Sequence, residues 1–496
     1  MRFGEKQHRI ILWSVAATAV AIAVAGAGLG RGLARERRRR LVSQRPLWLS
    51  ASRNPEKVKE RLAEIVAFAR ANSPYYRDLY KNLPARVEDS RLLPVTDKKT
   101  LMANFDRWVT DREVTIERVR KFIEDPSLVG EMLLGKYLVA TTAGTTGKPG
   151  IFILDDNHMR GGTSGLREAF RTWLSLGDVV RIVLRGARFA ALHATGGHFV
   201  SVTGFTRARR SSRVLAKLTR DFSVHAPIRE LVNGLNEFRP AVVLGYASTA
   251  SLLAREQELG RLRIKPVLLV VTAEGLAEEE YGRIAKAFGA KVRNTWGSTE
   301  IGGPTYSCTE GWLHVVGDWI ILEPVDADFR PVSPGEESDT VLVTNLANRV
   351  QPILRYDLGD RILQRPDPCP CGNPLPAIRV QGRSAEVLRF PTQAGKDVSI
   401  PPLAFEIDHV PGVDLSQVVQ TAPTNLRVRL RLESGADPDQ VWRTVHGELK
   451  HLLDSHELHE VTIERAEEPP EQSRGGKVRQ VIPLAQAEPP ADRKQD

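Results

Sequence analysis

Apolar residues near the start of the globular part of the chain recur every three to four positions. Within residues 55–82, Val58, Leu62 and Ile65 fall on one side of a helical wheel, which is typical of a helix that packs against a core. Ser73-Pro74 interrupts this spacing. The pattern predicts that the globular part begins with helices.

Between residues 151 and 330, short apolar runs alternate with segments of helical spacing. Val179–Leu184, Ala241–Leu244 and Val267–Val271 are such runs, and each is followed by a glycine or a polar turn. Apolar runs of this length predict buried strands. Their alternation with helices predicts an α/β fold with largely parallel sheets.

The pattern changes after about residue 383. Leu426–Leu432 alternates strictly between apolar and basic residues, which predicts a half-buried strand, while residues 437–454 have helical spacing and Val461–Ile463 predicts another strand. These elements predict a small α+β lid domain. The expected organisation is a basic N-terminal flank, a large multi-sheet α/β domain, the lid and a disordered tail, over residues 1–48, 49–383, 384–484 and 485–496.

The N-terminal flank contains an uncharged segment of 21 residues, 10–30, followed by Arg31, Arg35 and Arg37–Arg40. A helix of that length spans roughly 30 Å, the thickness of a bilayer core. Because the basic residues follow the apolar segment, the positive-inside rule predicts one membrane-spanning helix with the body in the cytoplasm. A peripheral helix and a misassigned start codon are the alternatives.

Charge and cysteine content narrow the class of protein. The net charge is +10, but residues 1–50 carry ten basic and two acidic residues, which leaves 60 basic and 58 acidic residues in the rest of the chain. A body this close to neutral lacks the basic excess of a nucleic-acid binder. The three cysteines are too few for a disulfide framework.

Three polar, glycine-containing segments carry candidate chemistry. Thr141–Pro149 combines hydroxyls, two glycines and Lys148, a composition that suits a triphosphate, although its spacing is not that of a P-loop. Asn294–Glu300 joins an aromatic residue to a carboxylate that could bind Mg²⁺. Arg355–Asp360 ends in a carboxylate that could accept ribose hydroxyls. Taken singly, each has a simple turn as its alternative, and a loop of threonine and glycine is more often a turn than a phosphate site.

Their order along the chain, together with Gly382-Arg383 and Gly475–Lys477, resembles the adenylate-forming superfamily of acyl-CoA synthetases and peptide-synthetase adenylation domains. The chain is most similar to the phenylacetate-CoA ligase group, which includes the capsule-biosynthesis adenylating proteins. Ser73–Arg77 and Leu93–Lys98 match the N-terminal region of that group. The resemblance runs from about residue 60 to residue 482.

The resemblance implies a role for each matching residue. Thr142, Thr145, Thr146 and Lys148 would hold the β- and γ-phosphates of ATP; Trp296 would stack on adenine opposite the backbone of Ala273, Glu274 and Gly275; Thr299 would bind the α-phosphate and Glu300 would bind Mg²⁺; Asp360 and Arg383 would hold the ribose; and Lys477 would enter the site from the lid.

The implied reaction has two steps. A substrate carboxylate attacks the α-phosphorus of ATP to give an acyl-adenylate and pyrophosphate, and a thiol, expected to be that of CoA, then attacks the adenylate. The substrate class is an aryl or acyl carboxylic acid. One departure concerns the hinge, where Arg383 is followed by Ser384 and Ala385 before Glu386, in place of the acidic residues usual in the group.

This departure bears more on the thioester step than on adenylation. Two alternatives stay open: an enzyme that transfers the acyl group to an amine, hydroxyl or carrier protein without CoA, and a catalytically silent nucleotide-binding homologue. His198, Gly245 and Tyr246 are candidates for the substrate pocket, although a histidine buried in the core with its polar groups satisfied is the alternative for His198.

The cysteines provide a separate hypothesis. Cys308 and His314 are six positions apart, and Cys369 and Cys371 flank one proline. Three cysteines and one histidine are a common tetrahedral zinc set, and some members of the resembled group carry a comparable structural zinc. A closed set of four ligands predicts a structural metal rather than a catalytic one. A chance grouping of reduced cysteines is the alternative.

Overall fold

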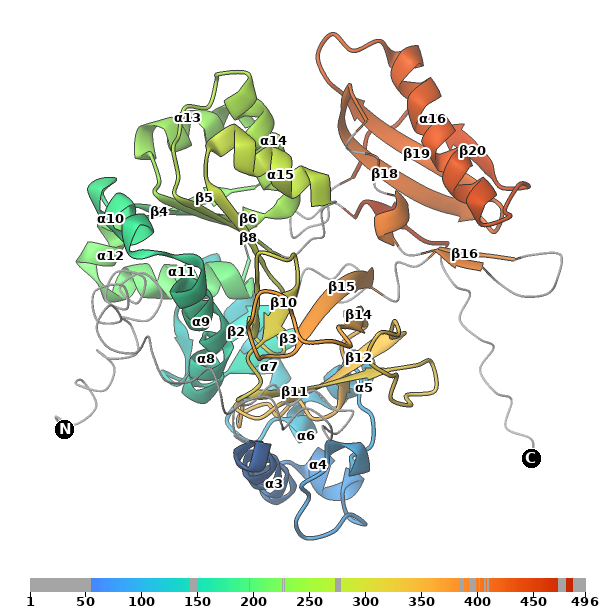
Figure 1. Cartoon of the computed structure of the whole chain (residues 1–496). Coiled ribbons are helices and arrows are strands. Elements are labelled where there is room, and N and C mark those ends of the chain that lie inside the picture. Colours follow the sequence, from blue (N-terminus) through green and yellow to red (C-terminus); the bar gives the residue numbers. More distant parts are fainter. Residues whose placement is uncertain are drawn as a thin grey trace. The chain divides into compact units, whose positions relative to one another are not determined.

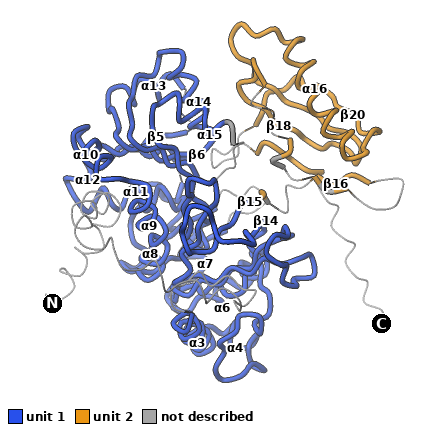
Figure 2. Tube along the Cα trace, in the orientation of Figure 1, with its two compact units in different colours: residues 1–380, 474–477 blue, residues 381–473, 478–496 orange. Residues whose placement is uncertain are grey.

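The structure is a computed structural model that describes residues 55–142, 150–195, 197–224, 226, 228–272, 278–383, 388–391, 398–400, 402–405, 407, 410–471 and 479–484. The chain divides into two compact units, and the division falls within one strand, between Val380 and Gln381 (Figure 2). The predicted membrane segment, residues 10–30, and the predicted tail, residues 485–496, lie outside the described residues.

Unit 1 begins with the predicted helices. Ser73 ends the first of them and caps the second, where its hydroxyl accepts a hydrogen bond from the Tyr76 backbone N–H at 3.3 Å, and Pro74 suits the first helical turn. Buried Trp108 anchors this region by donating from Nε1 to the Pro352 carbonyl at 2.7 Å. The elements are α3 (Pro55–Asn72), α4 (Pro74–Leu79), η1 (Ser90–Leu92), α5 (Lys98–Ala103), α6 (Phe105–Trp108), α7 (Ile116–Ile123) and η2 (Pro126–Leu128).

A small antiparallel sheet follows, with strand order β1-β2-β3. It consists of β1 (Met132–Leu133), β2 (Tyr137–Thr141) and β3 (Ile151–Leu154), with Thr141 opposite Ile151 in the register. The segment predicted to hold phosphates therefore connects two hydrogen-bonded strands, although its residues 143–149 lie outside the described part of the chain.

The predicted parallel sheet is present, with five strands in the order β5-β4-β6-β7-β8 (Figure 1). Its apolar strands pack between helices, as expected for a parallel sheet buried on both faces. The strands are β4 (Phe189–His193), β5 (Thr219–Ser223), β6 (Val242–Tyr246), β7 (Leu268–Thr272) and β8 (Lys291–Thr295). The helices of this region are α8 (Asp156–Gly162), α9 (Ser164–Trp173), α10 (Leu176–Leu184), α11 (Val200–Ser211), α12 (Arg213–Leu218), α13 (Ile228–Phe238), α14 (Ala247–Glu258) and α15 (Glu278–Phe288).

Two of the three apolar runs form strands as predicted, in β6 and β7, but the strand expected at Val179–Leu184 is wrong. This run belongs to α10. Ser175 caps the helix through a capping box with Asp178, which fixes a helical start that an apolar run alone does not reveal.

The remaining strands of unit 1 form two antiparallel sheets, so the parallel arrangement expected up to residue 330 ends at β8. One sheet has the order β14-β15-β10-β9 and the other the order β11-β12-β13. The strands are β9 (Thr305–Ser307), β10 (Leu313–Val315), β11 (Ile320–Val325), β12 (Thr340–Asn345), β13 (Tyr356–Asp357), β14 (Asp360–Gln364) and β15 (Ala377–Arg383).

Unit 2 is an α+β domain built on a four-stranded sheet of order β20-β19-β18-β21. The alternation in Leu426–Leu432 does form a strand, and helix α16 buries Val441, Val445, Leu449 and Leu453. The elements are β16 (Leu388–Phe390), β17 (Val398–Ile400), η4 (Pro402–Phe405), β18 (Val413–Ala422), β19 (Asn425–Leu432), α16 (Pro438–Ser455), β20 (Thr462–Arg465) and β21 (Val481–Ile482).

Among the helices in the described part of the chain, which starts at Pro55, none combines the length and the apolar character that crossing a bilayer requires.

Candidate functional site

The carboxyl edge of the parallel sheet collects most of the predicted site segments. His193 ends β4, Tyr246 ends β6, Thr272 ends β7 and Thr295 ends β8. Ala273–Gly275 directly follow β7, but they lie outside the described residues. In open parallel sheets, ligands bind beyond the carboxyl ends where the strand order reverses, which here is between β4 and β6.

A tight turn after β8 shapes this edge. The Ser298 N–H donates to the Gly302 carbonyl at 3.0 Å, and the Gly302 N–H donates to the Ser298 carbonyl at 2.8 Å. A Cβ at Gly297 would lie 2.0 Å from the Gly302 oxygen, so only glycine fits there. The backbone of Trp296 is fixed by Thr305, whose hydroxyl accepts from its N–H and donates to its carbonyl, both at 2.7 Å.

The predicted adenine and ribose residues are in direct contact. Trp296 Nε1–H donates to Asp360 Oδ2 at 2.8 Å, and both side chains are buried. Asp360 is the first residue of β14 and stands 64 positions after Trp296. The contact orients the indole and the carboxylate together at one place on the edge of the sheet.

Glu300 lies in the same turn and is buried. The Tyr356 hydroxyl donates to its Oε1 at 3.4 Å, and Asn345 Nδ2 donates to its backbone carbonyl at 2.9 Å. The same amide nitrogen lies 3.0 Å from Nδ1 of His158. Burial lowers the pKa of His158 to about 4, so this histidine is neutral at pH 7 and its Nδ1 accepts the hydrogen bond.

The phosphate segment is described only at its ends. The Thr142 hydroxyl accepts from the Gly150 N–H at 2.8 Å, and the Thr142 N–H donates to the Gly150 carbonyl at 3.0 Å. These bonds close the base of the segment that contains Thr145, Thr146 and Lys148, all three of which lie outside the described residues.

The candidates for a substrate pocket lie near the point where the strand order reverses. His198 is buried against Phe122, with ring centroids 5.5 Å apart, and its carbonyl accepts from the Thr141 N–H at 2.7 Å. Burial lowers the pKa of His198 against the opposing effect of Asp125. Gly245 allows a close approach of β4, because a Cβ there would lie 3.1 Å from Leu192 Cβ.

His193 is buried at the end of β4, next to a carboxylate. Its Nε2 lies 2.9 Å from Asp221 Oδ1, and Asp221 also pairs with Arg209 on α11. Tyr246, at the end of β6, is buried. Of these side chains, His198 lies beside the strand that leads into the phosphate segment.

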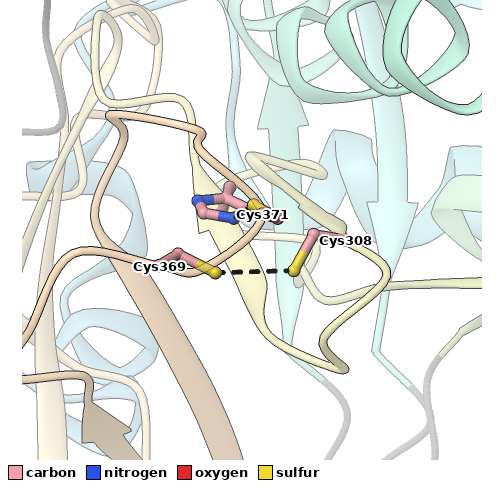
Figure 3. Close-up of side chains that lie close together, drawn as sticks. Cys308, Cys369 and Cys371 are labelled. Atoms are coloured by element: carbon pink, nitrogen blue, oxygen red, sulfur yellow. Dashed lines mark hydrogen bonds between the residues drawn. The ribbon is translucent and has the colours of Figure 1, made fainter.

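The four predicted metal ligands do converge. Ligand atoms of Cys308, His314, Cys369 and Cys371 all lie within 4.8 Å of one another, and Figure 3 shows the three cysteines turned toward one another. The Sγ atoms of Cys308 and Cys369 are 3.8 Å apart, and His314 Nε2 is 3.2 Å from Cys371 Sγ. For zinc bound to sulfur at about 2.3 Å, the edge of a regular tetrahedron is about 3.8 Å.

The rest of this cluster is arranged as metal sites require. His314 Nδ1 lies 3.0 Å from the Leu375 carbonyl, so Nδ1 carries the proton and Nε2 presents its lone pair to the cluster. Burial raises the pKa of the Cys371 thiol, whereas hydrogen bonds from the backbone N–H groups of Glu310 and Trp312 lower that of Cys308 despite burial. The donor set and its spacing therefore fit zinc.

No protein-family model matches the sequence, and no curated protein matches it. Among solved structures, 2-hydroxyisobutyryl-CoA ligase in the postadenylation state with 2-HIB-AMP is similar at TM-score 0.62 and 20% identity, over 86% of this chain and 88% of that one. The thioesterification state of that ligase, with 2-HIB-AMP and CoA, matches at TM-score 0.52 and 20% identity, over 87% and 89% of the two chains. The chain has the fold of 2-hydroxyisobutyryl-CoA ligase.

Within this ligase fold, Trp296, Thr299 and Glu300 of the predicted nucleotide set lie in or beside the turn after β8, where Asp360 joins them from the start of β14, and Thr142 lies at the base of the phosphate segment. Arg383 ends β15, with its side chain outside the described part of the structure, as is all of Lys477. His158 and Asn345 support Glu300 from α8 and β12 but were not predicted. No local signal marks them, because their spacing along the chain reveals nothing of the contact.

Proposed function

We propose that this protein activates a carboxylic acid with ATP, releasing pyrophosphate and forming an acyl-adenylate, and then transfers the acyl group to CoA. The observation that carries the proposal is the convergence of Trp296, Glu300 and Asp360 beyond the carboxyl ends of a parallel sheet in a ligase fold. An aromatic face, a buried carboxylate and a second carboxylate suit a base, a metal-bound phosphate and a ribose.

The chemistry asks for alignment rather than a protein nucleophile. The substrate carboxylate must approach the α-phosphorus opposite the leaving pyrophosphate, so the protein has to hold both reactants and neutralise charge. Thr299 would donate to the α-phosphate, and Asp360 would hold the ribose in the orientation that its contact with Trp296 sets. Glu300 is the residue that would hold Mg²⁺, which neutralises phosphate charge when it is bound.

The finer assignment is to the phenylacetate-CoA ligase type, with an aryl or acyl acid as substrate. The motifs at Ser73–Arg77 and Leu93–Lys98 support this assignment. The acid would lie where the strand order reverses, near Tyr246 and His198.

ATP–pyrophosphate exchange by the purified full chain, against a panel of aryl and fatty acids, tests this function. Lys477→Ala should abolish exchange, because it removes the positive charge expected between the carboxylate and the α-phosphate. Lys450→Ala, which alters a half-buried lysine of α16 paired with Asp454, should leave exchange unchanged. AMP release stimulated by CoA then tests the second step. Binding of ATP without exchange for any acid would favour a silent homologue.

We also propose that Cys308, His314, Cys369 and Cys371 hold a structural zinc. The convergence of the four ligand atoms within 4.8 Å and the orientation of His314 support this ion, and four protein ligands leave no open position for a substrate. Metal analysis of the purified chain should find about one zinc per chain. Recovery of iron instead of zinc would contradict this assignment.

Membrane attachment is a further part of the proposal. We propose that residues 10–30 anchor the protein and that the body lies in the cytoplasm, since the basic run at residues 31–40 follows the apolar segment. Extraction of membranes at alkaline pH should retain the full chain and release a chain that lacks residues 1–48. Release of both would contradict the anchor.

A further inference from the structure

Helix α10 exposes its apolar side. Leu176, Val180, Val183 and Leu184 are 62%, 55%, 50% and 80% exposed. Their positions along the helix place them on one stripe. We call this stripe the α10 face. Figure 1 shows α10 at the periphery of unit 1. A contiguous apolar stripe on a helix surface marks an interaction site.

The opposite side of α10 is firmly attached to the body. Asp178 is buried and its Oδ2 lies 2.6 Å from Nζ of Lys291, the first residue of β8. This ion pair and the burial of Ile182 against Phe189 and neighbouring side chains fix the rotation of the helix about its axis. The exposed stripe is therefore set by the fold and not by a loosely held helix.

A basic cavity adjoins the end of α10. It has a volume of about 680 Å³ and lies where the chain enters β4, β6 and β7, at the amino edge of the parallel sheet. Its cationic lining consists of Arg185, Arg188, Arg239, Arg261, Arg263 and Lys265, and its lining contains no carboxylate. Arg185 immediately follows Leu184 and caps α10, so the cavity and the α10 face form one continuous surface.

Most of this positive charge is uncompensated. Arg261 pairs with Glu256 at 2.6 Å, but the other five cationic residues have no carboxylate within ion-pair distance among the described residues. Arg188 Nε donates to the Arg239 carbonyl at 3.1 Å, and Arg263 Nε donates to the Gly260 carbonyl at 3.0 Å. These bonds hold two guanidinium groups in place, although like charges in one cavity repel each other without a bound anion.

We propose that the α10 face and the basic cavity together bind the surface of a membrane that contains anionic phospholipids. Apolar side chains beside a cluster of basic residues are the pattern that enters the interfacial region while the cations contact headgroup phosphates. The apolar segment at residues 10–30 and the basic run after it, which precede the described residues, favour a membrane over other occupants. The basic cavity lies at the amino edge of the parallel sheet, and a strand of five residues, about 16 Å long, separates it from the carboxyl edge.

The test uses the full chain in nanodiscs of phosphatidylcholine, with or without phosphatidylglycerol, and measures hydrogen–deuterium exchange. Peptides covering residues 176–188 and 259–265 should be protected in the anionic discs and not in the neutral ones. Leu92, another exposed apolar residue, supplies an internal control peptide that should not change.

Variants sharpen the test. Arg185→Gln combined with Arg263→Gln should reduce the protection at least tenfold, because each basic residue at an anionic surface contributes about fivefold in affinity. Leu184→Ser should weaken the protection without any change in the basic residues. Arg330→Gln changes a distant exposed arginine and should leave the protection as it is. Unchanged circular dichroism and an unchanged melting midpoint show that each variant is folded.

Three results would overturn the proposal. Equal exchange in both kinds of disc would exclude an anionic membrane. Protection by inorganic tripolyphosphate in neutral discs, without an effect of anionic lipid, would assign the cavity to a soluble phosphate ligand. Protection of equal strength in both discs that rises with protein concentration would assign the α10 face to a second copy of the chain.

Discussion

The Cys/His cluster and the turn after β8 are both assembled from segments far apart in the sequence, yet they differ in what completes them. In the cluster, four ligand atoms point at one centre and lie within 4.8 Å of one another. In the turn, Trp296, Asp360 and Glu300 are held by protein hydrogen bonds and would use their remaining surface for a ligand.

This difference assigns the Cys/His cluster to the stability of the fold and the turn after β8 to the reaction. A closed set of four ligands contributes folding energy and offers no position for a substrate. A turn whose polar groups are held in place but not closed around an ion is arranged for substrate binding. Changes in the cluster should therefore act on stability, and changes in the turn should act on turnover.

The largest effect should come from the Cys/His cluster. Cys308→Ser removes one of the four proposed zinc ligands, and we expect the free energy of unfolding to fall by about 4 kcal/mol or more, as for other losses of a structural metal. Denaturant titration and metal analysis of the same preparations measure this. Turnover per folded molecule should stay within about twofold of the wild type. A tenfold loss of turnover would require the activation barrier to rise by about 1.4 kcal/mol. Loss of turnover with full stability would contradict the separation.

Glu300→Gln should act in the opposite sense. The substitution keeps the shape of the side chain and removes the charge that would bind Mg²⁺, so we expect ATP–pyrophosphate exchange to fall about 100- to 1000-fold. The melting midpoint should be retained, because the glutamine can still accept from the Tyr356 hydroxyl. Glu310→Gln, at an exposed glutamate beside the metal cluster, is the matched control and should exchange normally.

Asp360→Asn should give a smaller loss, confined to nucleotide binding. The asparagine oxygen can still accept from Trp296 Nε1, but a charged acceptor for the ribose is lost. Hydrogen bonds to charged groups contribute about 2–3 kcal/mol, so KM for ATP should rise about 30- to 150-fold. Steady-state kinetics at varied ATP check this, with exposed Asp367→Asn as control. An unchanged KM would place the ribose elsewhere.

Local patterns in the sequence predicted two of the five parallel strands, β6 and β7, a helix over residues 437–454, and the Cys/His set that converges, because each has its own periodicity or residue set. Val179–Leu184 was assigned to a strand because a run of five apolar residues around Arg181 suits a strand as well as a helix. The capping box formed by Ser175 and Asp178 marks a helix start, and it is the local signal that distinguishes the helix from a strand here.

Contacts between distant segments could not be predicted in the same way. The hydrogen bond from Trp296 to Asp360 spans 64 positions and depends on how β14 is placed beside the turn. The support of Glu300 by Asn345 and His158 depends on three separate elements. The resemblance to the adenylate-forming superfamily identified the candidate site residues. The contacts that orient these residues became visible only in the structure.

The smallest expected effect concerns the support of the turn by buried His158. In the unfolded chain a histidine takes up a proton near pH 6.5, whereas burial lowers the pKa of His158 in the folded protein to about 4. The unfolded state therefore binds more protons between these values, and the free energy of unfolding falls as the pH is lowered, by about 1.4 kcal/mol per pH unit. His158→Gln, which can still accept from Asn345, should reduce this slope in denaturant titrations between pH 6.5 and pH 5. Exposed His456→Gln should keep the wild-type slope, and an equal slope in all three proteins would show that His158 titrates normally and does not support the turn as a neutral group.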